Sequence, residues 1–122
     1  MIVVDTNIVI AYLGHEEGVV VRIRQVIAEG EEIVVPTVVV AETLAYPGID
    51  DETIERTRKW FSEIIVMSLD LEIAERAAAL RRETGLKIID SIVIATALEN
   101  HAKLASRDAA FKKIEGLSLL AW

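Results

Sequence analysis

The chain opens with Met1-Ile2-Val3-Val4-Asp5-Thr6-Asn7, a short apolar run that ends on a carboxylate. A second apolar stretch, Ile8 to Leu13, follows directly. Strands that are buried on both faces of a parallel sheet have such continuous apolar runs, without the alternation of half-exposed strands. We therefore expect a buried parallel strand that presents Asp5 at its carboxyl end, the edge where open α/β sheets bind ligands.

Predicted strands and helices alternate along the rest of the sequence. Apolar runs predict further strands at Ile33–Val35, Ile64–Met67, Lys103–Ser106 and Leu117–Ala121. Helical spacing and capping signals predict helices at Thr6–Leu13, Val19–Ala28, Asp50–Glu63, Asp70–Thr84 and Asp90–Glu99, with a brief helical turn at Ala109–Lys113. This order predicts a parallel sheet covered by helices on both faces.

The segment Thr37–Leu44 is ambiguous. Its β-branched residues favour a strand, whereas Pro36 directly before it suits the start of a helix. Because Pro36 has no amide hydrogen to give to a central ladder, we expect it to end the strand Ile33–Val35. Local propensity leaves both alternatives open for Thr37–Leu44.

The length of 122 residues is typical of one domain, and we expect a single domain over residues 1–122. Hydrophobic residues make up 52% of the chain but aromatic residues only 5%, so the core is built mainly from Val, Ile, Leu and Ala, with apolar area to spare for a partner. Cysteine is absent, which excludes disulfides and thiolate metal ligands. With neither a secretory leader nor an apolar run of about 18 residues, we expect a soluble cytoplasmic protein with no membrane association.

The net charge of −7, from 20 acidic and 13 basic residues, argues against tight nonspecific binding of nucleic acids, which needs a basic surface. It does not exclude a nuclease, because divalent cations held by carboxylates would invert the local charge. Six basic side chains are then expected to remain available for phosphates: Arg22, Arg24, Arg81, Arg82, Lys103 and Arg107.

Four carboxylates in apolar surroundings, Asp5, Glu42, Asp90 and Asp108, are the candidate site. Taken singly, each of the three aspartates precedes a predicted helix and could be only an N-cap, and Glu42 could reach solvent from a half-buried helix. Taken together, they can converge at the carboxyl edge of the sheet. Like charges about 4 Å apart repel by roughly 1 kcal/mol even in water, so a shared cleft favours a bound divalent cation.

The expected cation is Mg²⁺ or Mn²⁺. Oxygen ligands select hard cations, and the isolated positions of His15 and His101 disfavour zinc and indicate ordinary surface residues. A carboxylate crevice that leaves water on the metal is an arrangement used to attack phosphates. The expected reaction is in-line displacement at a phosphate without a covalent enzyme intermediate. Asp5 and Asp90 are the expected main ligands, and Glu42 and Asp108 are expected to ligate through water, orient the nucleophile or help to remove its proton.

Four stretches carry these carboxylates: Val3-Val4-Asp5-Thr6-Asn7; Val35-Pro36-Thr37 leading to Ala41-Glu42-Thr43-Leu44; Leu86-Lys87-Ile88-Ile89-Asp90-Ser91 leading to Ala95-Thr96-Ala97; and Leu104-Ala105-Ser106-Arg107-Asp108 followed by Phe111. In this order they resemble the successive motifs of PIN-domain proteins, in particular the VapC-like toxin ribonucleases. The resemblance covers essentially the whole chain. It favours a helix for Thr37–Leu44.

The resemblance implies a three-layer α/β/α PIN-like fold with a central, mostly parallel sheet of four to five strands, and Mg²⁺- or Mn²⁺-dependent cleavage of RNA. It implies an acidic quartet of catalytic, metal-binding residues, Asp5, Glu42, Asp90 and Asp108, supported by the polar side chains of Thr6, Asn7 and Ser106. Many family members have a further acidic residue where Ala110 stands here, so the choice between one and two metal ions stays open.

The resemblance also implies partners, namely a second copy in a homodimer and a small antitoxin whose tail fills the acidic crevice. The helices Val19–Ala28 and Asp50–Glu63, with Trp60 and Phe61, are a candidate docking groove, although these aromatic residues could equally pack in the core. The RNA that is cut is not identified by the sequence, and tRNA, rRNA and mRNA all remain open.

Two other phosphate chemistries fit less well, and one reading without catalysis stays open. A haloacid-dehalogenase-type phosphotransferase needs a second aspartate where Asn7 stands, and a receiver domain needs a phosphoacceptor that Val66-Met67-Ser68 does not offer. The remaining alternative is a catalytically weak or inactive PIN-like module for RNA binding or assembly.

Overall fold

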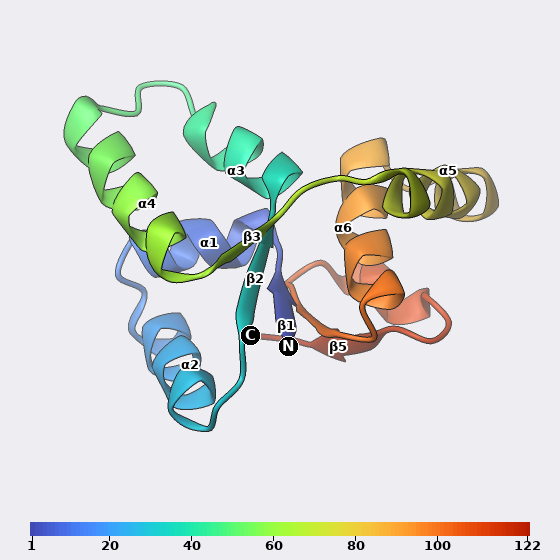
Figure 1. Cartoon of the computed structure of the whole chain (residues 1–122), viewed down its shortest axis with the longest axis horizontal. Coiled ribbons are helices and arrows are strands. Elements are labelled where there is room, and N and C mark those ends of the chain that lie inside the picture. Colours follow the sequence, from blue (N-terminus) through green and yellow to red (C-terminus); the bar gives the residue numbers. More distant parts are fainter.

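A computed structural model describes all residues, 1–122, as one five-stranded parallel sheet in the order β3-β2-β1-β4-β5 (Figure 1). The strands are β1 (Ile2–Val4), β2 (Ile33–Pro36), β3 (Ile65–Met67), β4 (Lys103–Ala105) and β5 (Ser118–Leu120). The helices are α1 (Thr6–Leu13), α2 (Glu17–Ala28), α3 (Thr37–Leu44), α4 (Asp51–Glu63), α5 (Leu71–Thr84) and α6 (Ile88–Glu99), and a 3₁₀ helix, η1, spans Ala109–Lys113.

Helices lie on both sides of the sheet, which confirms the three-layer α/β/α prediction. In Figure 1, α1, α2 and α4 lie on one side and α5 and α6 on the other, while α3 lies at the end of the sheet where β1 and β2 finish. All strand pairs are parallel, so the sheet is fully rather than mostly parallel. No helix of the structure has both the length and the apolar character that crossing a bilayer requires.

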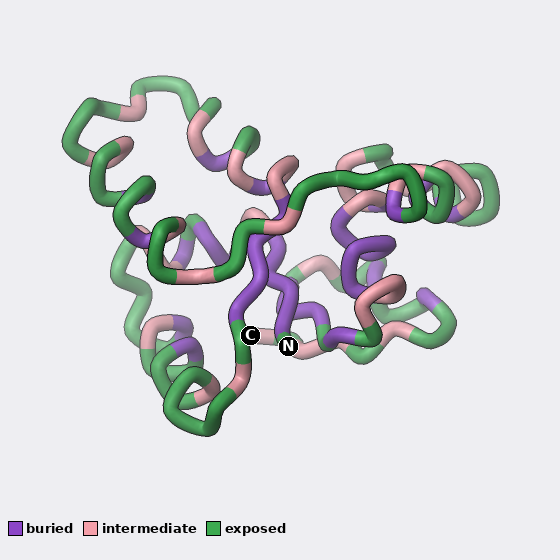
Figure 2. Tube along the Cα trace, viewed as in Figure 1, coloured by how far each residue is buried: buried purple, intermediate pink, exposed green.

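The centre of the sheet is as apolar and as buried as the opening residues predict. In β1, Val3 pairs with Val34 of β2 and with Leu104 of β4, and all three side chains are fully buried. Helix α6 packs beside them with five consecutive buried residues, Val93–Ala97, as expected for a helix that is apolar nearly all round (Figure 2). This centre is rigid support for the carboxyl ends of β1 and β4.

The sheet is less fully covered than predicted at its β3 edge. Ile65 and Val66 are 36% and 40% exposed. β3 is the edge strand on this side of the sheet and pairs with β2 alone. An apolar strip of the sheet is therefore left at the surface.

The ambiguous segment Thr37–Leu44 is a helix, α3, as the family resemblance favours. Pro36 is both the last residue of β2 and the N-cap of α3, with ψ at 145°. Its missing amide hydrogen costs nothing at this junction, because the strand ends there and the first amides of a helix lack intrahelical partners. The turn from β2 into α3 thereby brings Glu42 towards the end of β1.

Candidate functional site

Asp5 lies at the carboxyl end of β1 and is the most enclosed of the four candidate carboxylates, with 6% of its surface exposed. One oxygen, Oδ1, accepts a hydrogen bond from the backbone N–H of Thr6 at 2.8 Å. The other, Oδ2, accepts from Ser106 Oγ at 2.7 Å and from Asn7 Nδ2 at 3.4 Å. Asp5 is thus an N-cap of α1, as the simpler reading allowed, and is also joined to β4 through Ser106.

Thr6 joins the second carboxylate to the first. While its backbone N–H binds Asp5, its hydroxyl donates to Glu42 Oε1 at 2.6 Å. Glu42 is exposed on α3, so it reaches solvent as the simpler reading expected, but it does so beside Asp5. Two carboxylates that are 37 positions apart in sequence are therefore held by the backbone and the side chain of one threonine.

Asp90 and Asp108 are both half-buried, and they are held differently. Asp108 caps η1, with Oδ1 accepting from the Ala110 N–H at 2.9 Å, as an N-cap reading predicts. For Asp90 that reading is wrong: α6 begins at Ile88 and its N-cap is Lys87, so Asp90 lies inside the first turn. The Asp90 carboxylate therefore does not cap α6, although it lies on a helix that is otherwise nearly all apolar.

The four carboxylates act on one another electrostatically. Burial raises the pKa of Asp5 above its usual value, the hydrogen bonds from Ser106 and Thr6 oppose this, and the charges of Glu42 and Asp108 raise it further. Burial likewise raises the pKa of Asp90, followed by the charges of Asp5, Asp108 and Glu42, with Lys87 opposing. Each of the four carboxylates therefore lies within electrostatic range of others in the set.

None of the four carboxylates is in an ion pair with a basic residue. All five ion pairs of the structure lie elsewhere and involve the acidic groups of Glu31, Glu55, Glu99 and Glu16. Negative charge in such a cluster, where Lys87 near Asp90 is the one opposing charge and no ion pair forms, is unfavourable unless a cation or protons compensate it. This is the strongest physical sign that the cluster is a binding site.

The donor chemistry fits a hard divalent cation, but the side chains do not by themselves enclose one. All donors are carboxylate or hydroxyl oxygens, and both histidines are exposed, as predicted. No three Asp, Glu, His or Cys side chains are arranged so as to hold a metal ion. Three of the carboxylates are held by local hydrogen-bond donors: Asp5 by Ser106, Glu42 by Thr6 and Asp108 by Ala110. Coordination would thus need rotation of side chains or ligation through water.

The basic residues expected to be available for phosphates are mostly occupied by contacts within the chain. Arg107 binds Glu16 and the Trp122 carbonyl, Lys103 binds Glu31, Arg81 donates to the carbonyls of Gly85 and Leu86, and Arg22 donates to that of Ala121. A phosphate would have to compete with these contacts for the four side chains. The contact between Arg107 and Glu16 lies next to Asp108, and sequence reasoning missed it because 91 residues separate the two partners.

Comparisons with known proteins identify the family and agree with the fold. The family model of the PIN domain matches residues 2–117. A toxin–antitoxin complex from Klebsiella pneumoniae contains a chain with a TM-score of 0.81 and 25% identity, covering 98% of this chain and 96% of that one. The structure of VapBC2 from Rickettsia felis bound to a promoter DNA fragment gives a TM-score of 0.87 at 19% identity. The match covers 100% of this chain and 99% of that one. FitAcB from Neisseria gonorrhoeae gives a TM-score of 0.74 at 20% identity, and the match covers 98% of this chain and 96% of that one. Among curated proteins, none matches the sequence.

Proposed function

Since this chain belongs to the PIN-domain family, we propose that it is a Mg²⁺- or Mn²⁺-dependent endoribonuclease, acting as the toxin of a VapBC-type pair. One observation carries the proposal: four carboxylates, of which all but Glu42 are at least half-buried, act on one another and none is in an ion pair with a basic residue. The likeness over nearly the full length of chains from toxin–antitoxin complexes supports the assignment to a toxin.

In this proposal Asp5 and Asp90 are the main metal ligands, with Glu42 and Asp108 completing the site. The ion, when bound, would supply an activated water and neutralise charge on the phosphate. Glu42 and Asp108, which are more accessible than Asp5, would orient the nucleophile and take up its proton. Ser106 and Thr6 fix the orientation of Asp5 and Glu42 through their hydroxyl groups, and Asn7 supports both Asp5 and Ser106.

A PIN-like module that binds RNA or assembles without cleaving it is the second candidate. Two observations favour it over the nuclease: Ala110 stands where many relatives have a further acidic residue, and no three carboxylates are already arranged around a metal position. The net charge of −7 weakens its RNA-binding form, because the phosphates of a bound RNA would face an acidic protein.

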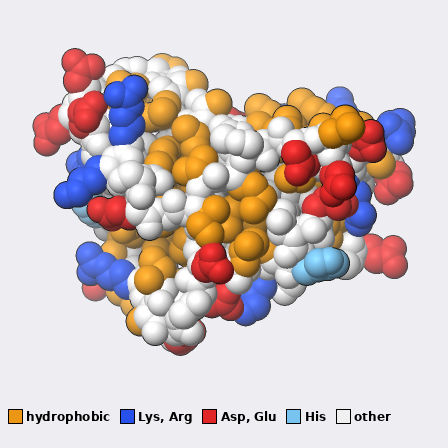
Figure 3. Space-filling model, in the orientation of Figure 1, with side chains coloured by type: hydrophobic (Ala, Val, Ile, Leu, Met, Phe, Trp, Pro, Cys, Tyr) orange, Lys and Arg blue, Asp and Glu red, His pale blue; other side chains and the backbone are white.

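We further propose an antitoxin partner and a homodimer. The helices named as a docking groove, α2 and α4, border a hollow of about 260 Å³ with α1, lined by Tyr12, Arg24 and Trp60 among others. Trp60 is 7% exposed and packs against Tyr12 with 4.5 Å between ring centroids, so it is mainly a core residue that also forms the floor of this hollow. Exposed apolar side chains, gathered across the middle of the face in Figure 3, support a second copy as a further partner.

The proposal is tested by incubating the purified chain with a set of single-stranded and structured RNAs, with and without Mg²⁺ or Mn²⁺. We expect cleavage that disappears when a chelator removes the ion and returns when the ion is added back. We also expect binding of the ion at sub-saturating concentration to weaken on acidification, starting above the pH at which ordinary carboxylates are protonated, because protons compete with the ion for Asp5 and Asp90, whose pKa values in the metal-free protein are raised. Metal-independent RNA binding without cleavage would instead favour the second candidate.

A further inference from the structure

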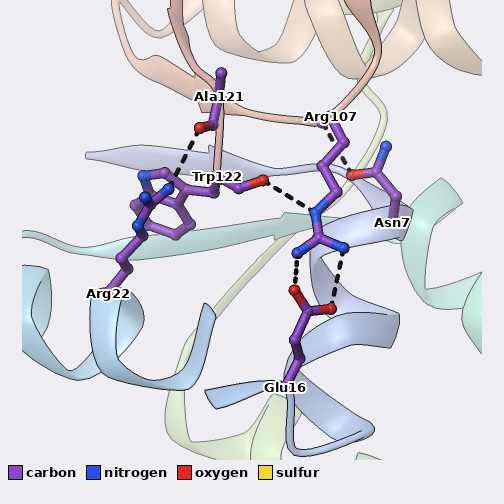
Figure 4. A network of polar contacts seen from close by, with 6 residues as sticks. All are labelled: Asn7, Glu16, Arg22, Arg107, Ala121 and Trp122. Atoms are coloured by element: carbon purple, nitrogen blue, oxygen red, sulfur yellow. Dashed lines mark hydrogen bonds and ion pairs between the residues drawn. The ribbon is translucent and has the colours of Figure 1, made fainter. Parts of the chain in front are cut away.

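Arg107 ties the loop that carries Asp108 to two distant parts of the chain (Figure 4). Its guanidinium group donates through Nη1 to Glu16 Oε2 at 3.0 Å and through Nη2 to Glu16 Oε1, and Nε donates to the Trp122 carbonyl at 2.9 Å. Its backbone N–H donates to Asn7 Oδ1 at 3.3 Å. A planar guanidinium that forks onto a carboxylate fixes the geometry of both partners, which a single contact would not do.

Glu16 stands at the N-cap of α2 but does not cap that helix. A polar side chain at this position usually accepts a hydrogen bond from the first free amides. Here no side-chain capping bond is made, and both carboxylate oxygens bind Arg107 instead. The preceding residue, His15, has a φ of 59°, so the turn between α1 and α2 has an unusual backbone at the point where it presents Glu16. Helix α2 therefore has no side-chain cap at its N-terminus, and the Glu16 carboxylate binds Arg107 instead.

Glu16 is the ion-pair partner of Arg107. The carboxylate of Glu16 raises the pKa of Arg107, and Arg107 lowers the pKa of Glu16. Arg107 is absent from the charges that act on Asp5 or Asp90. Its direct contact with a site residue is made through its backbone, whose N–H donates to Asn7.

That backbone places two site residues. Ser106, directly before Arg107, donates to Asp5 and accepts the N–H of Asp108, the residue directly after Arg107, at 3.1 Å. Resting on the proposed function, we propose that Arg107 and Glu16 form a positioning pair, which holds the Ser106–Asp108 loop so that the carboxylates of Asp5 and Asp108 can bind one divalent ion. Neither member of the pair is a metal ligand or a phosphate contact.

The test is the affinity for Mn²⁺ without RNA, measured from the electron paramagnetic resonance signal of free Mn²⁺ during titration. R107M keeps the aliphatic part of the side chain and removes the bidentate ion pair with Glu16. E16S also removes this ion pair and supplies a better N-cap for α2. We expect each variant to bind Mn²⁺ about tenfold more weakly, as for other residues that orient metal ligands, and the double variant to lose no more than either single one. Thermal unfolding of E16S should occur at the wild-type temperature or above, which separates positioning from loss of stability.

R76M is the matched control, because Arg76 forms an exposed ion pair with Glu99 that touches no site residue. It should leave Mn²⁺ affinity unchanged, and an equal loss in R76M would overturn the inference by assigning the effect to net charge. Wild-type affinity in R107M and E16S, with D5N clearly weakened, would overturn the positioning pair alone. Unchanged affinity in D5N would overturn the proposed metal site, and the positioning pair with it.

Discussion

Replacing Asp5 by Asn is expected to lower metal-dependent RNA cleavage at least about a hundredfold, because changes to residues that only orient metal ligands already cost about 10- to 100-fold. Asn keeps the size of the side chain, but its single oxygen can accept from Ser106 or from the Thr6 N–H and not from both, so one of these hydrogen bonds is lost. The larger change is the removal of the charge of the most enclosed carboxylate. The measurement is the initial rate of cleavage at saturating Mg²⁺ for both proteins.

The same substitution elsewhere provides the control for D5N. Asp51 lies exposed in the first turn of α4, and its charge is not among those that act on Asp5 or Asp90. D51N should cleave RNA at the wild-type rate. Comparable rates for D5N and D51N would contradict a catalytic role for Asp5, whereas folding of D5N is checked independently by circular dichroism.

Truncating Phe111 to Ala is expected to cost about 3–5 kcal/mol in the free energy of unfolding, the usual range for a buried Phe in a core. Phe111 is 1% exposed and is the largest fully buried side chain of the protein. It belongs to η1, whose N-cap is Asp108, and its N–H donates to the Asp108 carbonyl at 3.2 Å. Urea unfolding followed by circular dichroism measures the loss.

Phe61 offers the matched comparison for F111A, since it is only half-buried on α4. F61A should be destabilised clearly less than F111A, because less apolar surface returns to water. Equal losses for the two variants would show that η1 is not anchored in the core as described. If F111A remains folded at low temperature, it should also bind Mn²⁺ more weakly, because the turn that presents Asp108 loses its anchor.

The centre of the fold could be predicted from the sequence because continuous apolar runs leave few alternatives. The run Ile2–Val4 is a central strand, and the all-round apolar stretch after Asp90 is the most buried helix. Both signals are local, and each needs only its own residues to be read. The placement of Asp5 at the carboxyl end of a central strand follows directly from the first of them.

Other features depend on contacts that no local pattern contains. The β-branched start of α3 favours a strand by propensity, and the packing of α3 against α1 and α6 overrides it. The position of Asp90 within the first turn of α6, and not at its cap, depends on Lys87 serving as the N-cap. The exposure of Ile65 and Val66 depends on which strand lies at the edge of the sheet. The ion pair between Arg107 and Glu16 depends on how the loop after β4 packs against the turn before α2.

The location of Mn²⁺ in a crystal of the chain, given by its anomalous scattering, tests the central claim most directly. We predict a peak between Asp5 and Asp90, within about 2–2.6 Å of a carboxylate oxygen of each, with Glu42 and Asp108 bordering it directly or through water. A crystal soaked at a Mn²⁺ concentration that supports cleavage, with peaks only at other surface carboxylates or none at all, would contradict the account.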